Sequence, residues 1–375
     1  MNGRLVCPLC GHQAHPVAVP PPCPDCAVPL RLELPLPSLR TGQLRGRGQW
    51  RYAPFLPPVE PVSLGEGATP LVPSLHIGPR LGVELAYKLE GANPTGSFKD
   101  RGAAALVAVL RSCGAQVVAD DSSGNAGAAL AAYAARARLE AWIFVPAYAS
   151  DKKLAQIRTY GARTVAVPGP REEATRAALA ACATESEVVY ASHNRSPYFV
   201  AGVKTLAYEI AEDLGWAVPD HLVVPVGGGG LLLGMCQGMG ELHRLSWIDR
   251  LPQVHAAQAL ACAPIARAAA AGQPAPTPIQ PGDTIAEGVR IATPERGQEV
   301  LRALAEFRGT AVAVSEEAIR SAQAELARRE GIYVEPTSAV AAAAVAELVA
   351  QGHVQPGESV VVPLTGSGLK TPTLS

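Results

Sequence analysis

The sequence carries no excess of either charge. Its 32 Lys and Arg residues nearly balance 33 Asp and Glu residues, and the formal net charge is −1. Such a chain has no overall basic field that would attract nucleic acid or an anionic membrane surface. We therefore expect a small-molecule substrate bound at local sites, with no nucleic-acid or membrane partner.

A long apolar run is also missing. Met1–Arg4 lead directly to cysteines, and later apolar stretches are interrupted by Gly, Pro or charged residues. The absence of a segment of signal-peptide length predicts a soluble, cytoplasmic protein. The length of 375 residues exceeds one ordinary domain and indicates roughly two domains with an appendage.

Four of the eight cysteines lie before residue 30. Cys7 and Cys10 form one C-x-x-C pair, and Cys23 and Cys26 form a second. Two such pairs can supply the four thiolates of a tetrahedral zinc site, which would be structural because no position is left for substrate. Two disulfides are the alternative, which the cytosolic character of the chain disfavours. The remaining cysteines are expected to be core residues: Cys113, Cys182, Cys236 and Cys262.

The pattern along the chain indicates three parts. Residues 1–34 form the cysteine-rich extension, and the Pro-, Gly- and Arg-rich residues 35–61 are typical of a linker or a strap. From residue 62 to 375, short apolar runs alternate with Ala-rich helical stretches such as Asn125–Ala137 and Arg171–Thr184. This alternation predicts an α/β fold with parallel sheets covered by helices.

Lys99 lies at the start of a predicted helix, after Asn93-Pro94-Thr95-Gly96. The positive end of a helix and apolar surroundings favour a neutral amine, which is the form that makes a Schiff base. A lysine beside Asp100 and Arg101 is otherwise usually a solvated surface charge. Other segments must decide between these readings.

Three further segments place polar groups or glycines where a predicted strand ends. Gly227, Gly228, Gly229 and Gly230 follow Leu222–Pro225, and such a run can cradle a phosphate or be only a flexible turn. Ser122, Ser123, Gly124 and Asn125 begin a helix, where they can bind a carboxylate or act as an ordinary N-cap. Thr365 follows Ser359–Pro363. In an open parallel sheet these strand ends gather ligands, so the segments and Lys99 are expected to converge.

In this order the segments resemble the fold-type II family of pyridoxal-phosphate enzymes, over roughly residues 62–370. The resemblance implies two doubly wound parallel-sheet domains of the tryptophan synthase β-like fold, with the N-terminal zinc-ribbon-like extension added. The smaller domain would span about 100–205, inserted in a larger one formed by 62–99 and 206–375. Within the family the chain looks most like threonine synthase, through four segments: Leu64–Leu71, Phe98–Gly102, Gly202–Thr205 and Leu364–Lys370.

The resemblance also implies a role for each residue. Lys99 forms the internal Schiff base with pyridoxal 5′-phosphate and is the catalytic base, while Asn125 contacts the O3′ of the cofactor. The run Gly227–Gly230 holds the cofactor phosphate, and Thr365 faces the pyridine nitrogen. Ser122, Ser123 and Gly124 hold the substrate carboxylate. Glu287 is a weaker candidate lining residue. A homodimer is implied as well.

The expected reaction converts O-phospho-L-homoserine and water to L-threonine and phosphate. Two departures from the threonine synthase pattern favour an alternative, a threonine or serine ammonia-lyase or another β-elimination or replacement enzyme. The glycine run is unbroken, and Phe199 stands where a phosphate-binding arginine is expected. His193, Arg195 or Lys204 would have to compensate.

A hypothesis of another class is a catalytically silent zinc-ribbon adaptor. Residues 7–26 contain no aromatic residue and almost no Lys or Arg, so they offer neither stacking nor phosphate neutralisation.

Overall fold

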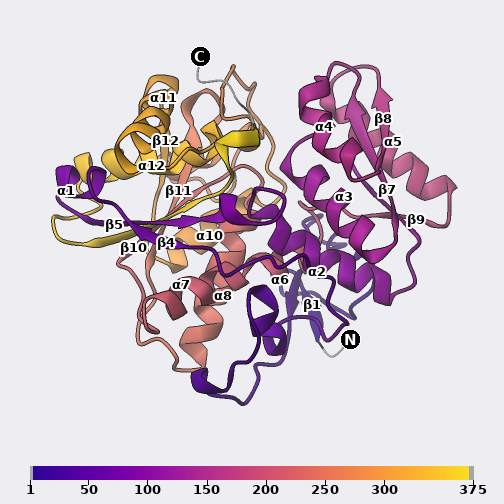
Figure 1. Ribbon diagram of the computed structural model, residues 1–375, viewed down its shortest axis with the longest axis horizontal. Helices are drawn as coiled ribbons and strands as arrows, with labels where there is room; N and C mark the ends of the chain where they lie inside the picture. The colour runs from indigo at the N-terminus through magenta and orange to yellow at the C-terminus, as the bar shows by residue number, and fades with distance from the viewer. Residues whose placement is uncertain (1–2, 371–375) are drawn as a thin grey trace. The chain divides into compact units, whose positions relative to one another are not determined.

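The computed structural model describes residues 3–370, and the chain divides into two units (Figure 1). Unit 1 contains the described residues up to Gly67 together with Asn93–Val203. Unit 2 contains Ala68–Ala92 together with the chain from Lys204 onward. The predicted catalytic region extends to residue 375. Its last part, residues 371–375, lies outside the described residues.

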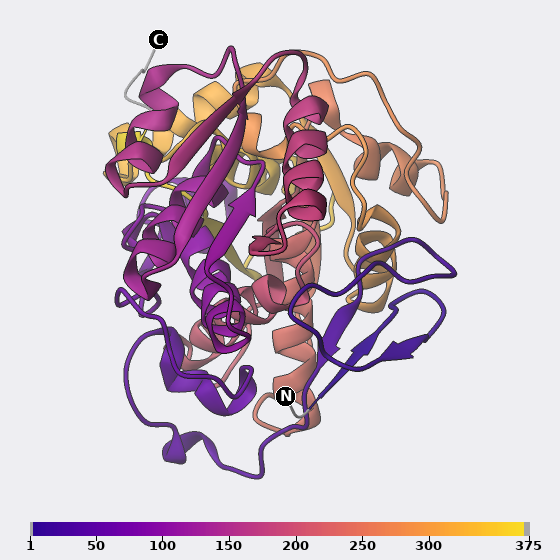
Figure 2. The ribbon, with the colours of Figure 1, turned by 90° about the vertical axis from the view of Figure 1, so that its right-hand side faces the viewer.

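Unit 1 begins with a small antiparallel sheet in the order β2-β1-β3, drawn as indigo arrows in Figure 2. Leu5 of β1 pairs with Leu32 of β3, and both side chains are buried. Two short 3-10 helices follow on the strap. The bounds are β1 (Arg4–Val6), β2 (Gln13–Ala14), β3 (Arg31–Glu33), η1 (Thr41–Gln43) and η2 (Gln49–Phe55).

The strap is tied to the main body of unit 1. The Gln49 side-chain amide donates to the carbonyl oxygen of Arg101 (2.9 Å), and the Trp50 indole N–H donates to Glu66 (2.7 Å). Glu66 also accepts a hydrogen bond from the Tyr133 hydroxyl, at 2.9 Å. Gln49, Trp50 and the following Glu66 are thus hydrogen-bonded to other parts of unit 1.

The main sheet of unit 1 has four parallel strands in the order β8-β7-β6-β9. Ala174 and Ala178 of α5 pack on it against Val117, Phe144 and Val188. The elements are α2 (Lys99–Ser112), β6 (Val117–Asp120), α3 (Asn125–Ala137), β7 (Glu140–Pro146), α4 (Asp151–Thr159), β8 (Arg163–Val167), α5 (Arg171–Thr184), β9 (Val188–Tyr190) and α6 (Pro197–Val203).

Unit 2 has a six-stranded sheet in the order β12-β11-β10-β13-β5-β4, parallel except for the antiparallel β4–β5 pair at one edge. The Ala- and Val-rich α12 is apolar on all sides and packs into the core of this unit. The first elements of unit 2 are β4 (Leu71–Pro73), α1 (Ile77–Leu81), β5 (Glu84–Leu89), η3 (Glu90–Ala92), α7 (Thr205–Asp213), β10 (His221–Pro225), α8 (Gly230–Arg244) and β11 (Gln253–Ala259). The remainder is η4 (Leu260–Cys262), α9 (Pro264–Ala270), η5 (Glu287–Val289), α10 (Gly297–Glu306), β12 (Ala311–Val314), α11 (Glu316–Glu325), η6 (Leu326–Glu330), α12 (Pro336–Ala350), β13 (Ser359–Leu364) and η7 (Gly368–Lys370).

Two parallel sheets, each with its own helices, confirm the predicted α/β fold class. The helices at Asn125–Ala137 and Arg171–Thr184 have the bounds that the sequence predicts. The expectation of four core cysteines is wrong for Cys113, which is exposed because it follows the last residue of α2, whereas Cys236 and Cys262 are buried. None of the helices within residues 3–370 has the length and apolarity needed to cross a bilayer.

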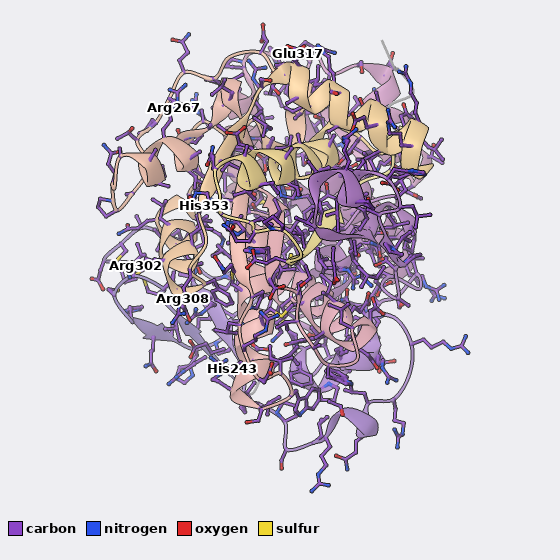
Figure 3. The ribbon with its side chains drawn as sticks, turned by 90° about the vertical axis from the view of Figure 1, so that its left-hand side faces the viewer. His243, Arg267, Arg302, Arg308, Glu317 and His353 are labelled. Atoms are coloured by element: carbon purple, nitrogen blue, oxygen red, sulfur yellow. The ribbon has the colours of Figure 1, made fainter. Side chains whose placement is uncertain are left out.

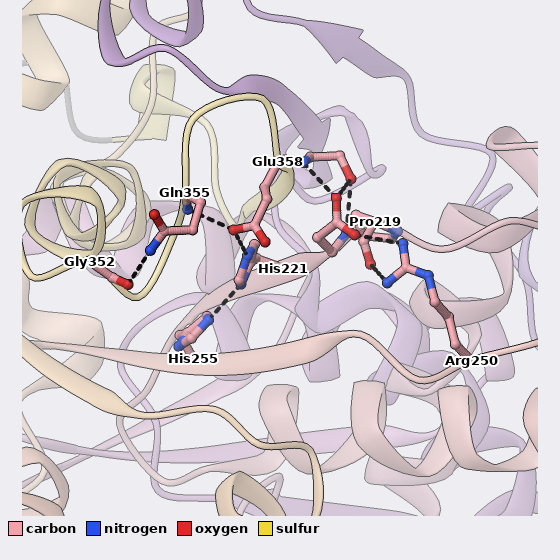
Figure 4. A network of polar contacts seen from close by, with 9 residues as sticks. Pro219, His221, Arg250, His255, Gly352, Gln355 and Glu358 are labelled. Atoms are coloured by element: carbon pink, nitrogen blue, oxygen red, sulfur yellow. Dashed lines mark hydrogen bonds and ion pairs between the residues drawn. The ribbon is translucent and has the colours of Figure 1, made fainter.

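A chain of buried polar side chains lies near the amino ends of β10, β11 and β13 (Figure 4). The backbone N–H of Thr310 donates to His255 Nδ1 (3.2 Å), so His255 carries its proton on Nε2 and donates to His221 Nδ1 (3.0 Å). His221 Nε2 in turn donates to the Glu358 carboxylate, at 2.8 Å. Each ring nitrogen of these two imidazoles therefore has a partner, which is how buried imidazoles avoid a desolvation penalty.

Candidate functional site

Lys99 is the first residue of α2, and a buried carboxylate fixes the turn before it. Asp100 is fully buried and accepts hydrogen bonds from the backbone N–H of Thr95 (2.7 Å) and from the Thr95 hydroxyl. Gly96 has a φ of +86° and donates its N–H to the Asn93 carbonyl oxygen, at 2.8 Å. The turn and the helix start are thus held together, and Lys99 lies at the positive end of the helix dipole.

The two residues that follow Lys99 are not surface charges. Asp100 and Arg101 are both 0% exposed, and Lys99 itself is partly buried. The Lys99 Nζ atom lies 4.7 Å from the Phe98 ring centroid and 5.6 Å from the Phe199 ring centroid. The reading of Lys99 as a solvated surface lysine is therefore wrong.

Two glycines allow α2 and α6 to approach closely beside Lys99. A Cβ atom on Gly102 would lie 2.5 Å from atoms of the Phe199 ring. A Cβ atom on Gly202 would lie 2.1 Å from the carbonyl oxygen of Arg101. Both distances are far below van der Waals contact, so only glycine permits this packing, which seats the Phe199 ring next to the lysine.

The start of α3 lacks a side-chain cap. Gly124 is the N-cap residue, and as a glycine it has no side chain to cap the helix. The Ser122 hydroxyl accepts from the Gly124 N–H only at 3.4 Å, and Ser122, Ser123 and Asn125 are partly exposed. The first N–H groups of α3 suit an anionic group such as a carboxylate, and both readings of this segment stay predictions.

The glycine run forms the connection between β10 and α8. Gly229 has a φ of +93°, and a Cβ atom there would lie 2.6 Å from Val300 Cγ2. A Cβ atom on Gly227 would lie 2.9 Å from the carbonyl oxygen of Gly288. These two positions require glycine for steric reasons, and the N-cap residue of α8, Gly229, has no side chain to cap the helix. A tight helix start of this kind is suited to a phosphate, and the phosphate cradle stays a prediction.

Gly228 and Gly230 complete this run, and Gly230 is the first residue of α8. The neighbouring Glu287, the weaker candidate, is an exposed residue of η5.

Thr365 follows β13 directly and is 2% exposed. Its hydroxyl oxygen lies 3.0 Å from the Ser338 hydroxyl oxygen at the start of α12. Ser338 Oγ also accepts the Gly366 N–H (2.8 Å), which fixes the backbone after the strand. A buried hydroxyl held in this way can face a ring nitrogen without imposing a charge on it.

The predicted site residues are divided between the two units. Lys99, Ser122, Ser123, Gly124 and Asn125 belong to unit 1, where α2 packs against α3. The glycine run and Thr365 belong to unit 2, at the carboxyl ends of the neighbouring strands β10 and β13. Each group therefore belongs to a single unit, and the convergence of all four segments stays a prediction.

The four N-terminal cysteines form one cluster. The sulfur atoms of Cys7, Cys10, Cys23 and Cys26 all lie within 4.8 Å of one another, and all four are free thiols. The two knuckles repeat one backbone pattern, in which the first cysteine accepts from the residue four positions later, Gly11 (3.0 Å) or Ala27 (2.8 Å). The donor set and geometry fit a tetrahedral zinc ion better than the alternative of two disulfides.

Two residues that could have replaced the missing arginine have other partners. Lys204 is 1% exposed and forms an ion pair with Glu241 (2.9 Å) within unit 2. His193 lies 3.4 Å from Asp120, through its Nδ1 atom. Sequence reasoning missed both acidic partners and the buried Asp100, because an isolated acidic residue gives no sign in the sequence of what it will pair with.

Each unit contributes residues that fit one part of a pyridoxal phosphate cofactor. Unit 1 offers a lysine held at a helix start, and unit 2 offers an uncapped glycine cradle and a buried hydroxyl. Residues 62–366 match the protein family described as pyridoxal-phosphate dependent enzyme. The chain belongs to this family.

Relatives of known name support this membership. The chain is 39% identical to the threonine synthase of Methanosarcina acetivorans, over 86% of this chain and 80% of that protein. It is 38% identical to the threonine synthase of Methanocaldococcus jannaschii, over 87% and 81% respectively. Among solved structures, the serine racemase of Dictyostelium discoideum matches with a TM-score of 0.67 at 27% identity, over 80% of this chain and 92% of that one. The chain is a threonine-synthase-like pyridoxal-phosphate enzyme and a lyase.

Proposed function

We propose that this enzyme converts O-phospho-L-homoserine and water to L-threonine and phosphate. The observation that carries the proposal is the combination of a lysine fixed at the start of α2 with an identity of 36–39% to several threonine synthases. When bound, pyridoxal phosphate supplies an electron sink for carbanion chemistry at the substrate α carbon.

Each candidate residue has a role in this proposal. The Lys99 amine holds the cofactor and then moves protons at the substrate carbons, and Asn125 orients the cofactor ring. The N–H groups of Gly227–Gly230 hold the phosphate of the cofactor, and Thr365 lies at its ring nitrogen. Ser122, Ser123 and Gly124 hold the substrate carboxylate at the start of α3, which fixes the geometry at the α carbon.

The test is turnover of O-phospho-L-homoserine by the purified holoenzyme, with threonine and phosphate measured together. Equal amounts of both products, lost in Lys99→Ala along with the visible absorbance of the bound cofactor, are the expected result. Absence of both products from the wild-type holoenzyme would refute the proposed reaction.

A second candidate reaction is β-elimination from L-serine or L-threonine to give a 2-oxo acid and ammonia. The buried Phe199 ring beside Lys99 favours it, because an aromatic ring cannot bind a substrate phosphate as an arginine does. The same holoenzyme assayed with these two amino acids distinguishes the candidates. The variant Phe199→Arg should gain activity with O-phospho-L-homoserine if the ring is what limits phosphate binding.

We further propose that the four N-terminal cysteines bind one structural zinc ion. The support is the single cluster of four sulfur atoms and the repeated knuckle backbone. Elemental analysis should give one zinc per chain, and Cys10→Ser should lower that content.

We also infer from the family resemblance that the enzyme is a cytoplasmic homodimer. Light scattering tests its oligomeric state.

A further inference from the structure

Two ionisable side chains of unit 1, Asp120 and His193, lie near Lys99. In the strand order β8-β7-β6-β9, the chain leaves β6 toward β7 and later returns to β9 on the other side. Ligands of open α/β sheets bind at the carboxyl ends of two such strands, where the order reverses. Asp120 is the last residue of β6, and His193 follows the end of β9. The pair therefore lies at the position where the topology opens a crevice in this sheet.

The acid of this pair is buried with spare hydrogen-bonding capacity. Asp120 is 1% exposed, and its Oδ2 atom lies 3.4 Å from His193 Nδ1. Its Oδ1 atom has no hydrogen-bond partner among residues 3–370. The adjacent Asp121 has other partners, the hydroxyls of Thr175 and Tyr190. Asp120 is thus left to act on the imidazole.

The His193 ring and Lys99 lie against the same aromatic ring. The His193 ring meets Phe199 edge to face, with centroids 5.9 Å apart, and the Lys99 Nζ atom lies 5.6 Å from the centroid of Phe199. Burial and the nearby charge of Lys99 lower the pKa of His193, although Asp120 opposes this effect. With Nδ1 directed at Asp120, the neutral ring presents the lone pair of Nε2, for which the described part of the chain offers no hydrogen-bond partner.

We propose that His193, oriented by Asp120, is a further catalytic residue that takes a proton from the water added to the substrate. This inference rests on the proposed function, in which Lys99 already serves as base at the α carbon. The water oxygen bonds to the β carbon, one of its O–H bonds breaks, and the proton passes to His193 Nε2. Asp120 stabilises the imidazolium until the proton is released to solvent.

Several charged groups set the pH at which His193 acts. Asp120 and Asp121 face it from β6 and the loop that follows, and Lys99 faces it from α2. Arg171 of α5 and Tyr190 of β9 act through Asp121. Because the base must be neutral, threonine formation should fall on the acid side of the His193 pKa, and this limb should disappear in a variant without the imidazole.

The test compares His193→Asn with the wild type, using O-phospho-L-homoserine as the probe. Asparagine keeps a donor near Asp120 and removes the base. Exchange of the substrate α hydrogen in heavy water measures proton transfer by Lys99 with the cofactor bound, so this exchange should persist in His193→Asn. Threonine formation should fall by about 100-fold or more. The exposed His243→Gln is the matched control. Threonine formation within twofold of the wild type in His193→Asn would overturn the proposal.

A second readout does not depend on turnover. The His193 imidazole is titrated by NMR in the wild-type holoenzyme and in Asp120→Asn. Its pKa should fall in Asp120→Asn, and an unchanged pKa there would overturn the proposal. Failure of the proposed function looks different, because the wild-type holoenzyme would then show no α-hydrogen exchange.

Discussion

The buried His255 of unit 2 should make this protein sensitive to mild acid. Burial lowers the pKa of His255 to about 3 from its ordinary 6.5. The unfolded chain therefore binds a proton at a pH where the folded chain does not, so stability is complete above pH ~6.5 and is lost as the pH falls toward 3. At pH 5 the loss worked from these two values is about 2 kcal/mol, with a limiting slope of ~1.4 kcal/mol per pH unit.

The perturbation that tests this is His255→Gln, since the amide can still donate to His221 but does not titrate (Figure 4). Urea unfolding is followed from pH 7.5 to 5 by the fluorescence of the four tryptophans, of which Trp216 and Trp247 lie in unit 2 with their ring centroids 5.1 Å apart. This window stays above the acid range in which Glu358 titrates, because hydrogen bonds from Gln355 and His221 lower its pKa.

The wild type should lose about 2 kcal/mol more than His255→Gln over this range. The exposed His243, near the end of α8 (Figure 3), provides the control variant His243→Gln, which should follow the wild type at every pH. If His255→Gln loses as much stability as the wild type between pH 7.5 and 5, burial does not keep His255 neutral and the reasoning is refuted.

Three further predictions concern other sites. Gly229→Ala places a Cβ atom 2.6 Å from Val300 at a φ of +93°, so it should weaken pyridoxal phosphate binding by tenfold or more, measured by equilibrium titration, with little change in circular dichroism. Ala27→Gly relieves a φ of +55° in the second knuckle and should stabilise unit 1 by about 0.5–1 kcal/mol in urea unfolding; a loss of stability would contradict this. Lys204→Met leaves the buried Glu241 without its ion-pair partner and should cost about 3–5 kcal/mol, whereas Lys204→Met with Glu241→Gln should recover part of that loss.

Much of the fold could be predicted from the sequence because its elements repeat a simple pattern. The strand ends at Pro225 and the helix starts at Lys99 and Asn125 are marked by changes from apolar runs to glycine, hydroxyl or Ala-rich residues. Local pattern carries this information, since it depends on residues a few positions apart.

The partners of the buried charges could not be predicted in this way. Asp120 meets His193, and Lys204 meets Glu241, over separations of 73 and 37 residues. Such pairs depend on which strand lies beside which and on where two helices cross. A sequence read alone does not contain that geometry, and it therefore left Lys204 as a candidate phosphate ligand.

The N-terminal cysteine module is joined to the helix that carries Phe199. The Tyr198 hydroxyl of α6 donates to the carbonyl oxygen of Val17 (2.7 Å), on the loop between the two knuckles. Strand β3 also packs against α6. Removing the first 34 residues would therefore expose a fully buried tyrosine one residue before the ring that lies against Lys99. The module therefore supports the position of α6 beside Lys99, and an enzyme shortened to residues 62–375 is expected to lose the alignment of α6 before it loses its fold.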